Sequence, residues 1–201
     1  METISIHKPK VVVIGSCNTD MVVKANRLPV PGETILGGTF YMNPGGKGAN
    51  QAIAASRLGA EVTFISKIGY DLFGLQALEI YKSEKINTDF IFTDQKSPSG
   101  VALISVDSFG ENSIIVAPGA SRSLSIEDIN KAEEKIKEAD IILMQLEIPI
   151  ETVEYAATIA KKYNKKVILN PAPASTLSNS FLNNVHTILP NRIEAEMLSG
   201  I

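Results

Sequence analysis

Cysteine, histidine and excess positive charge are all scarce in this sequence. Its 201 residues include one cysteine, Cys17, which cannot form an internal disulfide bond, and two histidines, too few for a zinc site built from cysteine and histidine. Lys and Arg number 19 against 22 Asp and Glu, so a formal net charge of -3 provides no basic field to attract nucleic acid. We therefore expect a protein of a reducing compartment without a nucleic-acid partner.

Long apolar runs are also missing. Residues 1–10 lack the apolar stretch of a signal peptide, and no later run approaches the ~18 residues that a membrane span needs. We therefore expect a cytoplasmic protein with no membrane partner. A composition of 44% hydrophobic and 20% charged residues excludes disorder and collagen-like repeats, and with this length it fits one or at most two globular domains. We predict a single domain over residues 1–201.

Strand and helix patterns alternate along the chain. Residues 11–14 form a β-branched run closed by Gly15, which is typical of a central strand buried on both faces. Residues 47–58 carry apolar side chains at helical spacing and are followed by Gly59, which ends the helix. Further strands are predicted over residues 62–65, 141–146, 167–169 and 185–189, and further helices over residues 71–83, 126–139 and 150–164. This alternation predicts an α/β fold with a mostly parallel central sheet flanked by helices.

Two segments, residues 20–42 and 99–118, interrupt this alternation. They contain short strand patterns and loops but no helical pattern, and residues 101–106 are suited to pair with residues 113–116. The two segments predict a small antiparallel β flap beside the main sheet. The flap is either a hairpin without a function or a lid that excludes water from a site at the strand ends.

Polar residues follow several of the predicted strands. In open α/β sheets ligands bind beyond the carboxyl ends of the strands, which makes these positions candidates for a site. Asn18 and Asp20 follow the first strand and are suited to hydrogen-bond a polyol, although an Asx turn is an equal alternative. Glu147 ends another apolar run, where a buried carboxylate needs partners. It is equally consistent with an exposed loop residue before Pro149.

A glycine-rich loop precedes the helix at residues 47–58. Gly45, Gly46 and Gly48 allow backbone N–H groups to approach a ligand, and the helix N-terminus adds partial positive charge. The loop is not a Walker motif, because Tyr41 stands where that motif has its first glycine and Gly48 replaces the Ser or Thr after lysine. The alternative is a flexible turn with a solvated lysine.

The last motif is Asn191 with Glu194, again after an apolar run. Their spacing is that of a helix N-cap and its partner three residues later. The competing interpretation places both residues near nucleotide phosphates and magnesium.

Taken together, five motifs resemble the ribokinase family of carbohydrate kinases, more than they resemble fructokinases or adenosine kinases. They are Gly-Ser-Cys-Asn-Thr-Asp at 15–20, Gly-Gly-Lys-Gly-Ala-Asn-Gln-Ala at 45–52, Met-Gln-Leu-Glu at 144–147, Asn-Pro-Ala-Pro-Ala at 170–174 and Asn-Arg-Ile-Glu at 191–194. The resemblance implies a ribokinase-like fold and transfer of the γ-phosphoryl group of ATP to the primary hydroxyl of ribose.

The resemblance also implies roles for individual residues. The sugar would be bound by Asn18, Thr19, Asp20, Gly45, Gly46, Lys47, Gly48, Ala49, Asn50 and Glu147. Asn191 would reach the phosphates of ATP, and Glu194 would act on Mg²⁺ through water. The flap would be the family's lid and the contact of a homodimer, and activation by a monovalent cation is left open.

One motif of the resembling family is missing. The Gly-Ala-Gly-Asp motif supplies that family's anion hole and the aspartate that activates the sugar hydroxyl, and no Gly-x-Gly-Asp occurs in this sequence. No catalytic residue is therefore assigned, and we expect a C-terminally incomplete kinase. The alternatives are a non-catalytic protein that binds sugar or dimerises, and a kinase for another sugar or a nucleoside.

Overall fold

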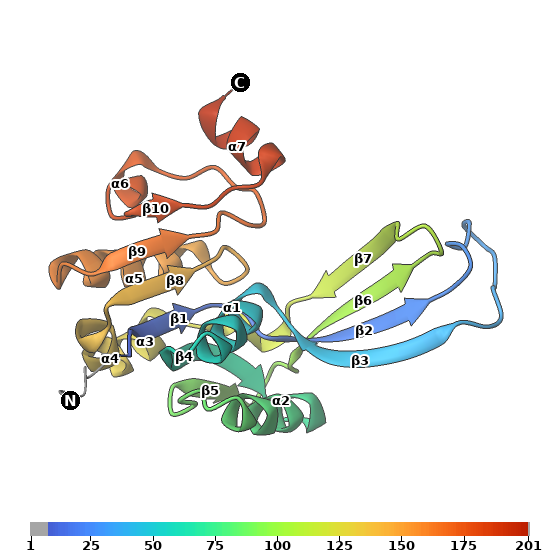
Figure 1. Ribbon diagram of the computed structural model, residues 1–201, viewed down its shortest axis with the longest axis horizontal. Helices are drawn as coiled ribbons and strands as arrows, with labels where there is room; N and C mark the ends of the chain where they lie inside the picture. The colour runs from blue at the N-terminus through green and yellow to red at the C-terminus, as the bar shows by residue number, and fades with distance from the viewer. Residues whose placement is uncertain (1–7, 201) are drawn as a thin grey trace, which may run out of the picture.

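The computed structural model describes residues 8–200, and its centre is a parallel sheet of six strands in the order β10-β9-β8-β1-β4-β5 (Figure 1). The strands are β1 (Lys10–Ile14), β4 (Glu61–Gly69), β5 (Ile91–Asp94), β8 (Ile141–Met144), β9 (Lys166–Leu169) and β10 (Thr187–Ile188). Every pair of neighbouring strands in this sheet is parallel. The predicted α/β architecture is confirmed.

Helices cover both faces of the sheet. They are α1 (Lys47–Arg57), α2 (Leu72–Ser83), η1 (Gly119–Ser123), α3 (Ile126–Lys131), α4 (Glu133–Glu138), α5 (Ile150–Lys162), α6 (Asn179–Leu182) and α7 (Arg192–Ser199). Alternation along β1 sends Val11 and Val13 into the core under α1 and α2, and Val12 and Ile14 into the core under α3 to α5. No helix within residues 8–200 is long and apolar enough to cross a membrane.

Some predicted elements have different limits. The single helix predicted over residues 126–139 is wrong, because the chain breaks at Ala132 into α3 and α4. Ile129, Ala132 and Ile136 remain buried in one core across the break, so their helical spacing does not distinguish one helix from two. The strand predicted to reach residue 146 ends at Met144, and the one predicted over residues 185–189 is β10 alone. The sequence analysis missed α6, which has too few residues for helical periodicity.

The flap is a second sheet that projects from the carboxyl edge of the first (Figure 1). It consists of β2 (Asn18–Lys24), β3 (Thr39–Gly45), β6 (Gly100–Val106) and β7 (Asn112–Ala117), in the order β3-β2-β6-β7. Its outer pairs are antiparallel as predicted, but the central pair, β2 and β6, is parallel. An entirely antiparallel flap was therefore wrong. Both central strands start at the main sheet and run outward, which makes them parallel.

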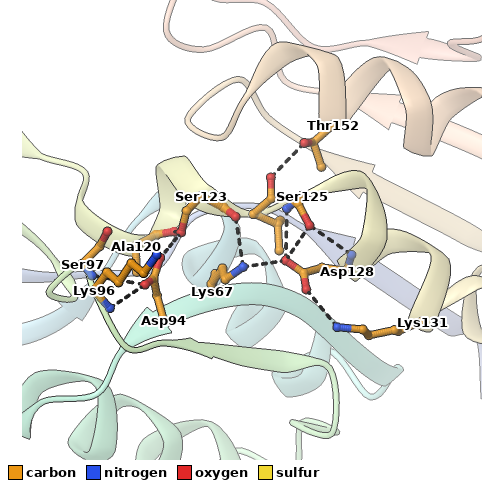
Figure 2. A network of polar contacts seen from close by, with 11 residues as sticks. Lys67, Asp94, Lys96, Ser97, Ala120, Ser123, Ser125, Asp128, Lys131 and Thr152 are labelled. Carbon is orange, nitrogen blue, oxygen red and sulfur yellow. Dashed lines mark hydrogen bonds and ion pairs between the residues drawn. The ribbon is translucent and has the colours of Figure 1, made fainter.

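A buried ion pair fixes the segment that leads back from the flap to the main sheet (Figure 2). Lys67 of β4 donates to the backbone carbonyl of Ser123 at 3.0 Å and to the carboxylate of Asp128 at 2.8 Å. Ser123 also donates to Asp94. Burial raises the pKa of Asp128, but hydrogen bonds from Lys67 and Ser125 outweigh it and leave the pKa below its ordinary value. The end of η1 is thus bound to both β4 and β5.

Removing Lys67 is expected to cost about 3 kcal/mol of unfolding free energy, because Lys67→Met leaves the carboxylate of Asp128 buried without its closest cation. Lys131→Met is the control. Its amine lies 3.6 Å from the same carboxylate on a side chain that is 64% exposed, so about 0–1 kcal/mol is expected. Urea unfolding at pH 7 measures the unfolding free energy of both variants. Equal losses would contradict the prediction that Lys67 contributes more than Lys131.

The ion pair of Lys67 and Asp128 makes the stability of the protein depend on pH. A lowered pKa in the folded state means that Asp128 stabilises the protein above its unfolded-state pKa of ~3.9, and that this contribution is lost as the pH falls through the folded value. The Lys67→Met variant should therefore lose less stability than the parent protein on acidification below pH ~4.

Candidate sugar-binding site

A cleft of about 300 Å³ lies where the flap meets the carboxyl edge of the main sheet. It is lined by Ser16, Asn18, Val116, Pro118, Arg122, Leu146, Glu147 and Pro173. These residues come from the loops after β1, β8 and β9, from η1, and from the flap. The structure thus places a cleft at the strand ends, where ligands bind in open α/β sheets.

Glu147 connects three segments at the floor of the cleft. Its carboxylate accepts hydrogen bonds from the hydroxyl of Ser16 and, at 3.0 Å, from the backbone N–H of Lys47. The amine of Lys47 lies 3.7 Å from its other oxygen. The N-terminus of α1 adds partial positive charge at the same point. These partners offset the cost of burying most of the Glu147 side chain. The backbone of Lys47 is held by Glu147, while its side chain is 41% exposed.

Asn18 and Asp20 lie on one face of β2, because side chains alternate along a strand. Asn18 is 6% exposed, and its Oδ1 atom has no hydrogen-bond partner within residues 8–200. Burial and the nearby charge of Glu147 together raise the pKa of Asp20. The carboxylate of Asp20 lies over Gly45, where a Cβ atom would come within 2.0 Å of Oδ1. Only glycine leaves room for this carboxylate.

The other two glycines of the loop are required by close packing. Gly46 has φ +89°, and a Cβ atom there would lie 2.8 Å from Cα of Cys17. A Cβ atom on Gly48 would lie 2.7 Å from the backbone of Gly15 and Ser16. The glycines therefore bring the start of α1 against the turn between β1 and β2. Direct contact between their N–H groups and a ligand stays a prediction.

Of the ten predicted sugar-binding residues, only Asn18 and Glu147 line the cleft. Lys47 contacts Glu147, and Gly45 lies against Asp20. Three others lie elsewhere or at the surface. Thr19 alternates to the opposite face of β2 and lines a separate hollow of about 50 Å³ with Phe73. Ala49 is fully buried in the core, and its N–H donates to the carbonyl of Ser16. Asn50 is exposed on α1. Thr19 and Ala49 thus face away from the cleft, because strand and helix periodicity turn neighbouring side chains in different directions. Contact between Asn50 and the sugar stays a prediction.

Asn191 and Glu194 form a capping box at the start of α7, as their spacing predicted. The N–H of Glu194 donates to Asn191, whose own N–H and side-chain amide donate to the two carboxylate oxygens of Glu194. Both oxygens are therefore engaged. Within residues 8–200, no group of three or more His, Cys, Asp or Glu side chains is arranged to hold a metal ion. Contacts of Asn191 and Glu194 with ATP and Mg²⁺ stay predictions. Magnesium fits at Glu194 only through water, because both of its carboxylate oxygens already accept hydrogen bonds.

The sequence analysis missed part of the cleft. Arg122 comes from a segment with no chemical motif, Val116 and Pro118 belong to the predicted flap, and Pro173 belongs to the motif at 170–174 but had no assigned role. Only the fold brings these residues together. Gln145 links the loop after β8 to α1, a role that its position in the Met-Gln-Leu-Glu motif did not indicate. It is fully buried and donates to Gln51 of α1, while its Oε1 atom has no partner within the described chain.

Comparison with known proteins identifies the family. The profile of the pfkB family carbohydrate kinases matches residues 8–201. This chain belongs to the pfkB family of carbohydrate kinases. The five motifs are therefore those of a carbohydrate kinase family.

Two sequence relatives and one solved structure show which carbohydrate kinases this chain is similar to. The chain is 46% identical over 189 residues to a ribokinase of Haemophilus influenzae, covering 94% of this chain and 62% of the relative. It is 39% identical to a deoxyribokinase of Salmonella typhi, covering 95% and 63%. A solved structure of Arabidopsis thaliana ribokinase, complexed with ribose and ATP, superposes with a TM-score of 0.84 at 32% identity, covering 96% and 64%. The chain thus spans somewhat less than two thirds of the length of these relatives.

Proposed function

We propose that the protein is a ribokinase, which transfers the γ-phosphoryl group of ATP to the primary hydroxyl of ribose. The observation that carries this proposal is that Asn18 and Glu147 line one cleft of about 300 Å³, a size suited to a pentose, while Asp20, on the same face of β2 as Asn18, is near enough to Glu147 for that charge to raise its pKa. The similarity to ribokinases supports the choice of sugar.

The polar groups of the cleft suit a ligand that carries several hydroxyls. The carboxylates of Asp20 and Glu147 accept hydrogen bonds, and each hydrogen bond to a charged group contributes ~1.5–3 kcal/mol. The Oδ1 atom of Asn18 is buried without a partner, which is costly until a hydroxyl donates to it. Lys47 holds Glu147 in place through its backbone N–H. The site therefore binds a polyol better than an apolar ligand.

The flap is the lid of this proposed site. Val116 and Pro118 line the cleft from the flap side, where closure excludes the water that would otherwise compete for the phosphoryl group. The outer part of the flap exposes Phe40, Tyr41 and Ile115, which suits it to contact a second copy in a homodimer.

The nucleotide binds at the carboxyl edge beyond β9 and β10, with Asn191 near its phosphates and Glu194 acting on Mg²⁺ through water. Bound Mg²⁺ neutralises charge on the transferring group, and the chain positions the two substrates. A monovalent cation as activator stays a prediction from the resemblance, and so does a cytoplasmic location.

Substrate profiling of the full-length protein tests this proposal. With ATP and Mg²⁺, we expect kcat/KM to be highest for ribose and lower for 2-deoxyribose, fructose and adenosine. A buried site built to hydrogen-bond a hydroxyl rejects an analogue that lacks it, because its polar groups are then left unpaired. Higher kcat/KM for adenosine or fructose would overturn the assignment to ribose. Heat stabilisation by ribose without turnover would instead indicate a non-catalytic sugar-binding protein.

A further inference from the structure

A second cleft continues from the candidate sugar-binding site. It has a volume of about 380 Å³ and shares Arg122, Leu146 and Pro173 with the first cleft. Its other walls are the start of α5 and the loop after β9, namely Ile148, Pro149, Ile150, Glu151, Ala174 and Ser175. A ligand larger than a free pentose is therefore able to extend from the first cleft into the second along the side chain of Arg122.

Arg122 places a positive charge at the junction of the two clefts. It forms no ion pair and no side-chain hydrogen bond with other residues in the described part of the chain, 8–200. Glu147, the carboxylate that shares the first cleft with it, is already engaged by Ser16 and Lys47. The guanidinium of Arg122 is consequently not needed to balance the charge of Glu147.

The backbone that carries Arg122 is held firmly. Ser121 exchanges hydrogen bonds with the backbone of Cys17, and Ser123 is bound to Lys67 and Asp94. Residues on both sides of Arg122 are thus fixed to the main sheet while its own side chain is exposed. A cation presented from a fixed backbone loses less entropy when it binds an anion than one on a mobile loop.

We propose that Arg122 binds the phosphate group of a pentose phosphate monoester whose sugar ring occupies the first cleft. Guanidinium groups pair with phosphate oxygens through two parallel hydrogen bonds, which favours a phosphate over a neutral hydroxyl. This inference rests on the proposed sugar site, and it adds a ligand class that competes with the free sugar. If the phosphate is on the primary hydroxyl, the ligand is the product of the proposed reaction, and its binding gives product inhibition.

Calorimetric titration of the full-length protein without nucleotide tests the proposal. The ligands are ribose, ribose 5-phosphate, ribose 1-phosphate and inorganic phosphate, and the variants are Arg122→Gln and Arg122→Lys. We expect Arg122→Gln to weaken binding of at least one sugar phosphate roughly 10-fold or more and to leave ribose unchanged. Arg122→Lys should restore part of the loss, because it keeps the charge but not the paired geometry.

Two control variants separate a specific contact from net charge. Lys161→Gln removes the same charge at the opposite end of α5 and should leave every affinity unchanged. Glu151→Gln removes a carboxylate from the second cleft and should strengthen sugar phosphate binding by a smaller factor.

Each remaining outcome has a defined meaning. Unchanged binding of both sugar phosphates in Arg122→Gln would refute the inference, and an equal loss for inorganic phosphate would show a general anion site instead. Failure of ribose to bind the parent protein would refute the proposed function. The role of Arg122 would still be supported if sugar phosphates bound and required it.

Discussion

Alanine at position 48 is expected to destabilise the protein by about 2–3 kcal/mol and to weaken sugar binding. The added Cβ atom would lie 2.7 Å from the backbone of Gly15 and Ser16, so α1 has to move away from the turn after β1. In an uncrowded helix the same change would stabilise by up to ~1 kcal/mol, which makes a loss of stability diagnostic of the close approach. Because Lys47 moves with α1, its contact with Glu147 is disturbed as well.

Gly59→Ala is the matched control for this prediction. It lies just beyond the other end of α1 and has φ +95°, with no atom within 4 Å of an added Cβ. Its cost is the backbone strain alone, about 1 kcal/mol, and sugar affinity should not change. Urea unfolding and titration with ribose measure both quantities. Normal ribose affinity in Gly48→Ala would show that the packing of α1 does not shape the site.

Replacing Glu147 by glutamine is expected to weaken ribose binding roughly 10- to 100-fold. The carboxylate accepts from Ser16 and from the backbone of Lys47, and a single amide oxygen cannot replace both charged contacts and still accept from a sugar. Part of the loss comes from Lys47, whose amine no longer faces a negative charge. Titration calorimetry on the full-length protein measures the change.

The pKa of Asp20 distinguishes a local effect of Glu147→Gln on the site from a general loss of structure. Burial raises the pKa of Asp20 and the charge of Glu147 raises it further, so Glu147→Gln should lower the pKa of Asp20 toward its ordinary value. Carboxyl resonances followed by NMR during a pH titration report this shift. Glu151→Gln, a change of the same chemistry outside the first cleft, should leave both the pKa of Asp20 and ribose affinity unaltered. Unchanged ribose affinity in Glu147→Gln would remove this residue from the site.

Sequence patterns predicted the main sheet because its elements depend on local features. The β-branched run of β1, the apolar spacing of α1 and the caps at Asp71 and Asn191 each lie within a few neighbouring residues. The break at Ala132 escaped prediction, since an apolar stripe has the same spacing whether one helix or two short ones carry it.

The candidate site was predictable only in part. The order of its motifs identified the family, and the positions of Asn18 and Glu147 followed from the rule that polar strand ends share an edge. Thr19 and Ala49 belong to the motifs at 15–20 and 45–52 but face away from the cleft. The order of residues in a motif does not show the direction of each side chain. Arg122 had no signal at all, as it lies in a short connection between the flap and α3.

By itself, then, the sequence determined the α/β alternation, the family and the set of polar residues that end the strands. Only the tertiary structure decided that the central strands of the flap run parallel, that three glycines are needed for close packing, and that Arg122 joins two clefts. The physical reason is the range of the interactions. Periodicity and capping act within one or two turns of chain, whereas strand pairing and cleft walls depend on contacts between segments about 100 residues apart, such as Lys47 with Glu147.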